Sequence, residues 1–202
     1  DPARARVVRH VLPQWPAELA RHGGRAINLG LHPDGRIAIA TGGGHAVALF
    51  QADGRFMARS APDTYRFSNG LWWVGDTLWT TDTNRTQLKR LDGHSLALQQ
   101  TVQLPADEAA RFLGPARAHA QDSSRVALIR FHNGMTVGRL AVLAGDPPAE
   151  ATAPRGGNGS RSFEPVDVDW LGDTVLASDG ASHQLQRLDH VIDLFRLPGR
   201  ER

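Results

Sequence analysis

Short segments with alternating apolar and polar residues, separated by turn signals, run along most of the chain. Segments 87–91 and 184–188 alternate with a period of two, and segment 46–50 is a third short stretch of the same length. A period of two places successive side chains on opposite faces of a strand, whereas a helix repeats after about 3.6 residues. Asp-Gly pairs at 34–35 and 53–54 supply the positive φ angles of tight hairpins. The pattern therefore predicts β-strands joined by hairpins.

The same pattern recurs as an internal repeat. Residues 73–92 and 170–189 align without a gap at an offset of 97, and ten of their 20 positions are identical. A second alignment, at an offset of 40, places 27–41 on 67–81. Because 97 residues hold two such units, we expect a further copy between them. The chain then divides into an N-terminal strand and connecting segment (1–25) and four units (26–60, 67–105, 112–150 and 163–199).

Each unit has space for four strands connected by polar turns. Four strands per unit, repeated about every 40–50 residues, are typical of the blades of a β-propeller. We therefore predict an all-β chain, a β-propeller built of four-stranded antiparallel blades. Four blades are visible, and an orphan strand near residues 7–11 resembles the outer strand of a further blade. The blades form either a single domain or an arc of a larger propeller.

Composition and charge exclude several classes of protein. The chain has 202 residues and no cysteine, which rules out disulfide scaffolds, thiolate-bound metals and thiol nucleophiles. Its 23 basic and 21 acidic residues nearly balance and are scattered, so we predict no nucleic-acid partner. No apolar run approaches the roughly 18 residues of a membrane-spanning helix. We interpret the opening Asp1-Pro2 as a processed N-terminus and expect a periplasmic or secreted protein.

Two units resemble repeats of known propellers. Segment 32–56 (HPDGRIAIATGGGHAVALFQADGRF) resembles an NHL repeat. Segment 68–92 (SNGLWWVGDTLWTTDTNRTQLKRLD) is similar both to NHL repeats and to the Asn-Gly-Leu blade of the regucalcin/gluconolactonase (SMP-30) propellers. These families usually close with six blades, so the four units form a compact four-bladed ring, an arc of a longer polypeptide, or a piece that another chain completes. The resemblance implies a binding or assembly module, without a cofactor, that presents its top-face loops and central channel to a protein or small ligand.

The regucalcin resemblance implies an alternative function, that of a divalent-metal-dependent lactonase or gluconolactonase-type hydrolase. In those enzymes a Glu and Asn or Asp side chains hold a channel cation, here calcium or zinc. The matching positions are Asn28, Asn69 and Glu164, and a catalytic base would be Asp82 or Asp179. Aspartates at the last two positions also suit a structural role, because Asx side chains readily accept hydrogen bonds from turn amides. A structural subunit of a larger complex is a third possibility.

Tryptophans distinguish repeated from unrepeated positions. Trp73 and Trp170 are equivalent in the repeat, so we predict that both pack between blades. Trp72 and Trp79 interrupt the repeat, because the equivalent positions of the fourth unit hold no tryptophan. Unrepeated aromatic residues on a repeated scaffold are candidates for binding a ligand or partner. Arg117, near the expected channel mouth of the third unit, is a further candidate.

Overall fold

The fold is made of antiparallel sheets that follow one another along the chain. The computed structural model describes residues 11, 13–17, 26–42, 45–105, 112–131, 138–155, 165–179, 184–187 and 191–193. Four sheets of four strands lie within these ranges, and in each sheet the strands are ordered as they are in the chain. The predicted all-β fold class is therefore confirmed. Most of the strand expected near residues 7–11 and all of Glu164 lie outside the described residues.

The first two sheets, called blades 1 and 2, occupy the N-terminal half. Blade 1 contains β1 (Ala26–Leu31), β2 (Ile37–Thr41), β3 (Val47–Phe50) and β4 (Phe56–Arg59). Blade 2 contains β5 (Leu71–Val74), β6 (Thr77–Asp82), β7 (Gln87–Asp92) and β8 (Leu98–Gln103), with the short 3-10 helix η1 (Thr83–Arg85) after β6. Consecutive strands pair in antiparallel fashion, as hairpin connections require.

Blades 3 and 4 repeat this arrangement. Blade 3 contains β9 (Phe112–Ala118), β10 (Val126–Phe131), β11 (Gly138–Ala144) and β12 (Ala149–Arg155). Blade 4 contains β13 (Pro165–Leu171), β14 (Thr174–Asp179), β15 (Gln184–Arg187) and β16 (Val191–Asp193). In the part of the chain that the structure describes, no helix is long and apolar enough to cross a membrane.

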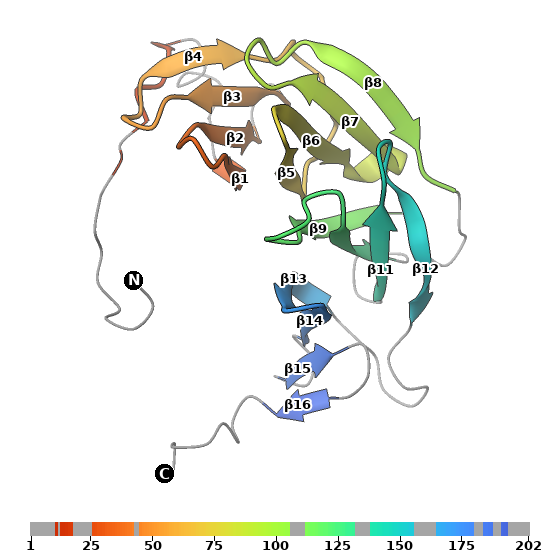
Figure 1. Cartoon of the computed structure of the whole chain (residues 1–202). Coiled ribbons are helices and arrows are strands. Elements are labelled where there is room, and N and C mark those ends of the chain that lie inside the picture. Colours follow the sequence, from red (N-terminus) through yellow and green to blue (C-terminus); the bar gives the residue numbers. More distant parts are fainter. Residues whose placement is uncertain are drawn as a thin grey trace, which may run out of the picture.

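The four blades follow one another around an arc (Figure 1). The first strands of the blades, β1, β5, β9 and β13, lie nearest the centre of the arc, and the fourth strands lie outermost. Neighbouring first strands contact each other from β1 to β5, from β5 to β9 and from β9 to β13. Side chains that face the centre therefore come from these four strands, which we call the channel strands.

The hydrophobic core lies between successive blades, and β6 shows how one strand serves two junctions. Leu78 packs with Ala38 in the cluster between blades 1 and 2. Trp79, the next residue, packs with Leu128 in the cluster between blades 2 and 3. Successive side chains of a strand point to opposite faces, so an apolar strand has a neighbour on each side. Burial of both faces stabilises the stack of blades at roughly 25 cal/mol per Å² of apolar surface.

Candidate functional site

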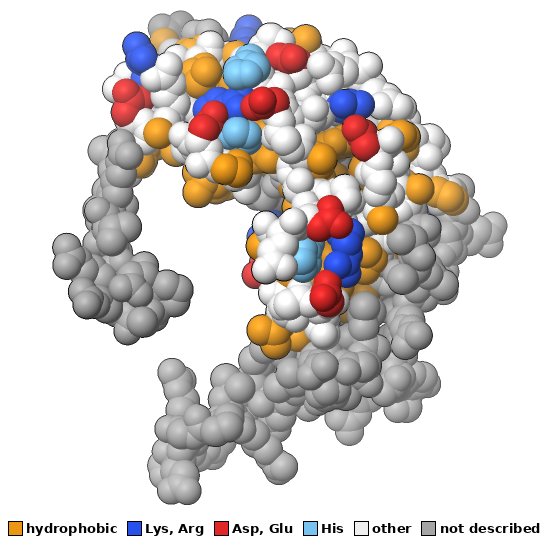
Figure 2. Space-filling view, in the orientation of Figure 1, with side chains coloured by type: hydrophobic (Ala, Val, Ile, Leu, Met, Phe, Trp, Pro, Cys, Tyr) orange, Lys and Arg blue, Asp and Glu red, His pale blue; other side chains and the backbone are white. Residues whose placement is uncertain are grey.

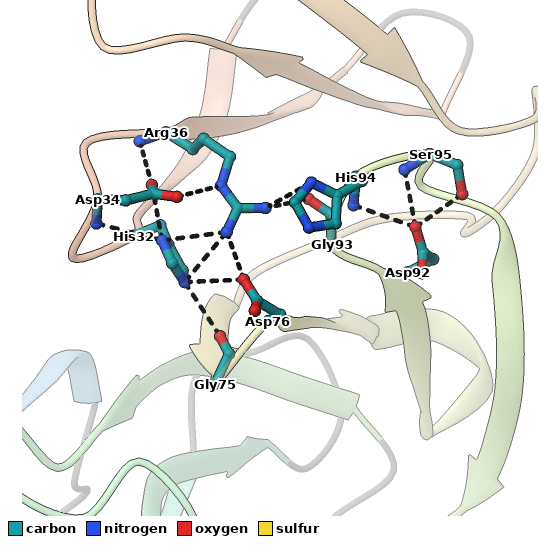
Figure 3. A network of polar contacts seen from close by, with 9 residues as sticks. All are labelled: His32, Asp34, Arg36, Gly75, Asp76, Asp92, Gly93, His94 and Ser95. Carbon is teal, nitrogen blue, oxygen red and sulfur yellow. Dashed lines mark hydrogen bonds and ion pairs between the residues drawn. The ribbon is translucent and has the colours of Figure 1, made fainter.

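A cluster of polar and aromatic side chains joins blade 1 to blade 2 (Figure 3). His32, after β1, lies edge-on to Trp73 of β5, with ring centroids 4.8 Å apart. The His32 Nε2 atom lies 3.2 Å from the carbonyl oxygen of Gly75. Arg36, before β2, places its Cζ atom 5.2 Å from the Trp73 ring centroid and donates a hydrogen bond to Asp76. The turn of blade 1 is thus held against the turn of blade 2.

The same cluster occurs a second time, between blades 3 and 4. His119 lies edge-on to Trp170 with ring centroids 4.9 Å apart, and its Nε2 atom is 3.0 Å from the Gly172 carbonyl oxygen. Arg125 places its Cζ atom 5.1 Å from the Trp170 centroid and donates a 2.6 Å hydrogen bond to Asp173. Figure 2 shows both clusters on one face of the molecule as groups of basic, acidic and histidine side chains. Trp73 and Trp170 therefore pack between blades, as their equivalence predicts.

The duplicated clusters show that the repeating structural unit is a pair of blades. The sequence repeat with an offset of 97 relates blade 2 to blade 4. The clusters extend this relation to blades 1 and 3, because His32 and His119 occupy matching positions, as do Arg36 and Arg125. We infer a structural role for these histidines and arginines in joining blades, a role that their dispersed positions in the sequence conceal.

Hydrogen bonds in the clusters stabilise the ionised form of their aspartates. The backbone N–H of Arg36 donates to Asp34 at 2.9 Å and is the largest cause that lowers the pKa of Asp34 to about 2. The Arg36 guanidinium lowers the pKa of Asp76. The Arg125 guanidinium lowers the pKa of Asp173 in the second cluster. Both junctions therefore contain carboxylates that are held charged below their ordinary range.

These shifts predict that acid weakens the junctions. A carboxyl whose pKa is lower in the folded than in the unfolded state stabilises the fold above its ordinary value of 3.8, and this contribution is lost as the pH falls toward about 2. We expect thermal unfolding followed by circular dichroism to show a falling midpoint over that window. Asp34→Asn keeps a side-chain oxygen for the Arg36 N–H but cannot ionise, so its midpoint should fall less. Equal falls in the unfolding midpoints of the two proteins would contradict a stabilising role for ionised Asp34.

Trp72 and Trp79 lie in the core between blades 2 and 3. They are 3% and 1% exposed, and their rings stack with centroids 6.4 Å apart. The Arg90 guanidinium lies over the Trp79 ring, with Cζ 5.9 Å from its centroid. In this structure the two tryptophans pack a blade junction and do not form an exposed surface.

Asp82, one of the two aspartates considered as a catalytic base, is fully buried at the end of β6. Its Oδ1 atom accepts a 2.9 Å hydrogen bond from the backbone N–H of Arg66, and its Oδ2 atom lies 3.4 Å from Arg85. It therefore anchors the loop that leads into blade 2. Asp179 ends β14, where its backbone pairs with Gln184, and its side chain is outside the described part.

The proposed metal ligands Asn28 and Asn69 use their side-chain amides in hydrogen bonds to backbone groups. The Asn28 Oδ1 atom accepts a 3.0 Å hydrogen bond from the backbone N–H of Leu29. The Asn69 Nδ2 group donates to the carbonyl oxygen of Leu113 at 3.1 Å. Among the described residues, no three His, Asp or Glu side chains form a metal-binding group. Because a hard cation needs several oxygen ligands at once, Asn28 and Asn69 do not by themselves fit one, and we derive no step through a metal.

The Asn-Gly-Leu segment, which suggested the regucalcin type, has a packing function. Gly70 forms a bridge with Ala116 of the neighbouring channel strand. A Cβ atom at Gly70 would lie only 2.6 Å from the Cβ atom of Ala116, so the close approach of the two strands requires glycine. The backbone N–H groups of Asn69 and Gly70 both donate to the Thr81 hydroxyl at 2.9 Å.

Arg117, in β9, holds the position in blade 3 that Gly30 holds in blade 1, because Arg117 pairs with Ala127 as Gly30 pairs with Ala38. Ala127 packs toward blade 4, so the Arg117 side chain lies on the face of blade 3 that meets blade 4. The Arg117 carbonyl oxygen accepts a 2.9 Å hydrogen bond from the Trp170 indole, which fixes its backbone. Its side chain is 37% exposed, with Nη2 3.3 Å from the Asp167 carboxylate. Trp170 thus joins Arg117 to the second cluster.

Two shallow cavities lie beside these residues. One, of about 500 Å³, is lined by Ala26, Ile27, Asn28, Leu29 and Arg117, so it joins β1 to β9. The other, of about 350 Å³, is lined by Asp167, Val168, Asp169, Leu176 and Ser178 of blade 4. The candidate site is therefore the channel surface around Arg117, with Asn28 on one side and Asp167 on the other.

No known family model matches the sequence, and no curated protein matches it. Solved structures match the fold. BamB from Moraxella catarrhalis has a TM-score of 0.52 at 16% identity, covering 80% of this chain and 45% of that chain. Virginiamycin B lyase from Staphylococcus aureus has a TM-score of 0.57 at 14% identity, covering 78% of this chain and 49% of that chain. Hydrazine synthase from Kuenenia stuttgartiensis has a TM-score of 0.62 at 12% identity, covering 89% of this chain and 48% of that chain. The chain has a β-propeller fold.

These likenesses concern architecture. The chain spans about half the length of the propeller structures that it matches, between 45% and 49% in these three. Identities of 12–16% establish a shared fold and leave the NHL or regucalcin type as a prediction.

Proposed function

We propose that this propeller arc is an NHL-like binding and assembly module whose channel surface binds a carboxylate-bearing ligand at Arg117. The observation that supports the proposal most strongly is the partly exposed guanidinium of Arg117, whose Nη2 atom lies 3.3 Å from the Asp167 carboxylate at the junction of blades 3 and 4. It borders a cavity of about 500 Å³ that Asn28 also lines. An exposed arginine on a rigid strand, beside a concave surface, is suited to recognise an anion.

The local hydrogen bonds favour exchange with a ligand. Arg117 donates from Nη1 to the carbonyl oxygen of Ala116 and from Nη2 to Asp167, both at 3.3 Å. Bonds of this length are weaker than the usual 2.9 Å, so a carboxylate that approaches in the plane of the guanidinium can replace them. The Trp170 indole holds the Arg117 backbone in place meanwhile. A protein segment with Glu or Asp, or a small organic acid, carries the required group.

Two probes test this proposal by titration calorimetry. The first is a short peptide with two glutamates, compared with the same peptide carrying glutamines, and the second is succinate. We expect the acidic peptide, succinate or both to bind, and Arg117→Gln to weaken binding at least about tenfold, because hydrogen bonds to charged groups are worth about 1.5–3 kcal/mol. Arg55→Gln, on the β3–β4 turn, is the matched control and should bind normally.

The two probes also separate the two sources of a carboxylate. Binding of the peptide alone indicates a protein segment, and binding of succinate alone indicates a small ligand. The proposal fails if neither probe binds, or if Arg117→Gln binds as tightly as the unchanged protein.

A further inference from the structure

The cavity beside Arg117 has two walls of different chemistry. Arg117 of β9 supplies one wall, and the described residues of the other wall are Ala26, Ile27, Asn28 and Leu29 of β1. Among these described residues, only Arg117 carries a charge. The cavity volume of about 500 Å³ lies within the usual range of small-ligand sites. A ligand that fills it therefore places an anionic group against β9 and uncharged groups against β1.

The β1 wall offers an exposed aliphatic surface. Leu29 is 56% exposed, although Ile39, its partner in the strand pair, is only 3% exposed. Leu29 thus keeps apolar surface in water beside the cavity. Contact with an aliphatic group removes this surface from water, which is favourable in proportion to the area covered. Leu31, two residues further along, is 64% exposed but is not among the described residues that line the cavity.

Asn28 adds an uncharged hydrogen-bond donor to the same wall. Its Oδ1 atom accepts a 3.0 Å hydrogen bond from the Leu29 N–H, whereas its Nδ2 group donates to none of the groups in the described part of the chain. The Nδ2 group of an asparagine carries two N–H donors and suits a carbonyl oxygen. Asn28 can therefore bind the amide carbonyl of a ligand that also contacts Leu29.

On the side of Arg117 away from β1, Asp167 limits the charge that a ligand can carry. The Asp167 carboxylate lies 3.3 Å from the Arg117 Nη2 atom and already balances much of the guanidinium charge. A second anionic group on this side of Arg117 meets a like charge, which repels it. One carboxylate is therefore favoured over two, and further affinity has to come from the uncharged wall.

We infer that the channel site prefers a carboxylate on an aliphatic residue whose amino group is acylated. In this arrangement the carboxylate binds Arg117, the amide carbonyl oxygen accepts from Asn28 Nδ2, and the aliphatic side chain covers Leu29. A protein C terminus that ends in leucine has this chemistry, and so does a free N-acylated leucine. The inference rests on the proposed function, because it keeps the carboxylate on Arg117 and adds the two contacts on β1.

Titration calorimetry with two small probes tests the inference. N-acetyl-leucine and N-acetyl-glycine both carry the carboxylate and the amide, and they differ only in the aliphatic side chain. We expect N-acetyl-leucine to bind at least about fivefold more tightly, because its side chain leaves water at Leu29. Leu29→Ser should remove most of this preference. Leu31→Ser, at a similarly exposed position of the same strand, is the matched control and should keep it.

A third probe tests the contact with Asn28. Isocaproate has the carboxylate and the side chain of leucine but lacks the amide. Asn28→Ala should weaken N-acetyl-leucine about threefold or more, because one neutral hydrogen bond is lost, and should leave isocaproate unchanged. Equal weakening of both probes contradicts the amide contact.

The outcomes separate the inference from the proposed function. Equal affinity for the leucine and glycine probes overturns the inference, and so does a leucine preference that survives Leu29→Ser. If Arg117→Gln still weakens the acidic peptide or succinate, the proposed function stands in either case. A short peptide that ends in leucine identifies the source of the carboxylate. Tighter binding than that of N-acetyl-leucine indicates a protein C terminus, and equal or weaker binding indicates a free acylated amino acid.

Discussion

Replacing Trp79 with alanine lowers the free energy of unfolding by about 3–5 kcal/mol, the range for large buried aromatic residues. Trp79 is 1% exposed at the centre of the junction between blades 2 and 3. Its removal deletes the stack with Trp72. It also leaves a cavity between two sheets, which can relax only partially to fill it. The Arg90 guanidinium also loses the ring beneath it. Urea unfolding followed by far-ultraviolet circular dichroism measures the change.

Leu98→Ala is the control for this experiment. Leu98 begins β8 and is 53% exposed, so its truncation should change the free energy of unfolding by less than about 0.5 kcal/mol. A loss below about 1 kcal/mol for Trp79→Ala would contradict the placement of this residue in the core.

Gly93→Ala should have the second largest effect, a loss of about 2–3 kcal/mol from overpacking. A Cβ atom at Gly93 would lie 1.9 Å from the carbonyl oxygen of Asp76, which belongs to the backbone of a turn and has little freedom to move. The Gly93 carbonyl oxygen also accepts a 2.7 Å hydrogen bond from Arg36. The substitution therefore strains the first cluster as well as blade 2. Urea unfolding of the two proteins gives the loss directly.

Gly75→Asn separates overcrowding from the general loss of a glycine. Gly75 has a φ of +53°, and a Cβ atom there would meet nothing within 4 Å. Asparagine tolerates the left-handed region, so this variant should lose much less stability than Gly93→Ala. Equal losses in the two variants would mean that steric contact with the Asp76 backbone is not the cause.

The architecture could be predicted from the sequence because blade positions recur in it. The Gly-Asp turns at 75–76 and 172–173 share one offset, and the strands on either side alternate with a period of two. The junction clusters could not be found in the same way. His32 and Arg36 are four residues apart, whereas His119 and Arg125 are six apart, so no constant offset aligns both pairs.

Trp72 and Trp79 show why an interrupted repeat is ambiguous. An aromatic residue that occurs in one blade only can mark a ligand surface or a different neighbour. Blade 3 covers both tryptophans, whereas Asp169 and Leu176 lie on a face that none of the described blades covers. Sequence alone shows that the tryptophans and their counterparts in blade 4 have different environments. It does not show which of the two is buried, because the covering side chains are distant in the chain. Arg117 could be named as a candidate from its place near the expected channel mouth of the third unit, but its contact with Asp167 requires the fold.

Binding at Arg117 is tested most directly by ¹H–¹⁵N NMR during titration with the acidic peptide. The Trp170 indole N–H donates to the Arg117 carbonyl oxygen, and Asn28 lines the same cavity as Arg117. We predict that the Trp170 indole and Asn28 side-chain signals shift together with increasing peptide, while the indole signal of buried Trp79 stays in place. Peptide binding that leaves the Trp170 and Asn28 signals unchanged would place the ligand elsewhere and contradict a channel site at Arg117.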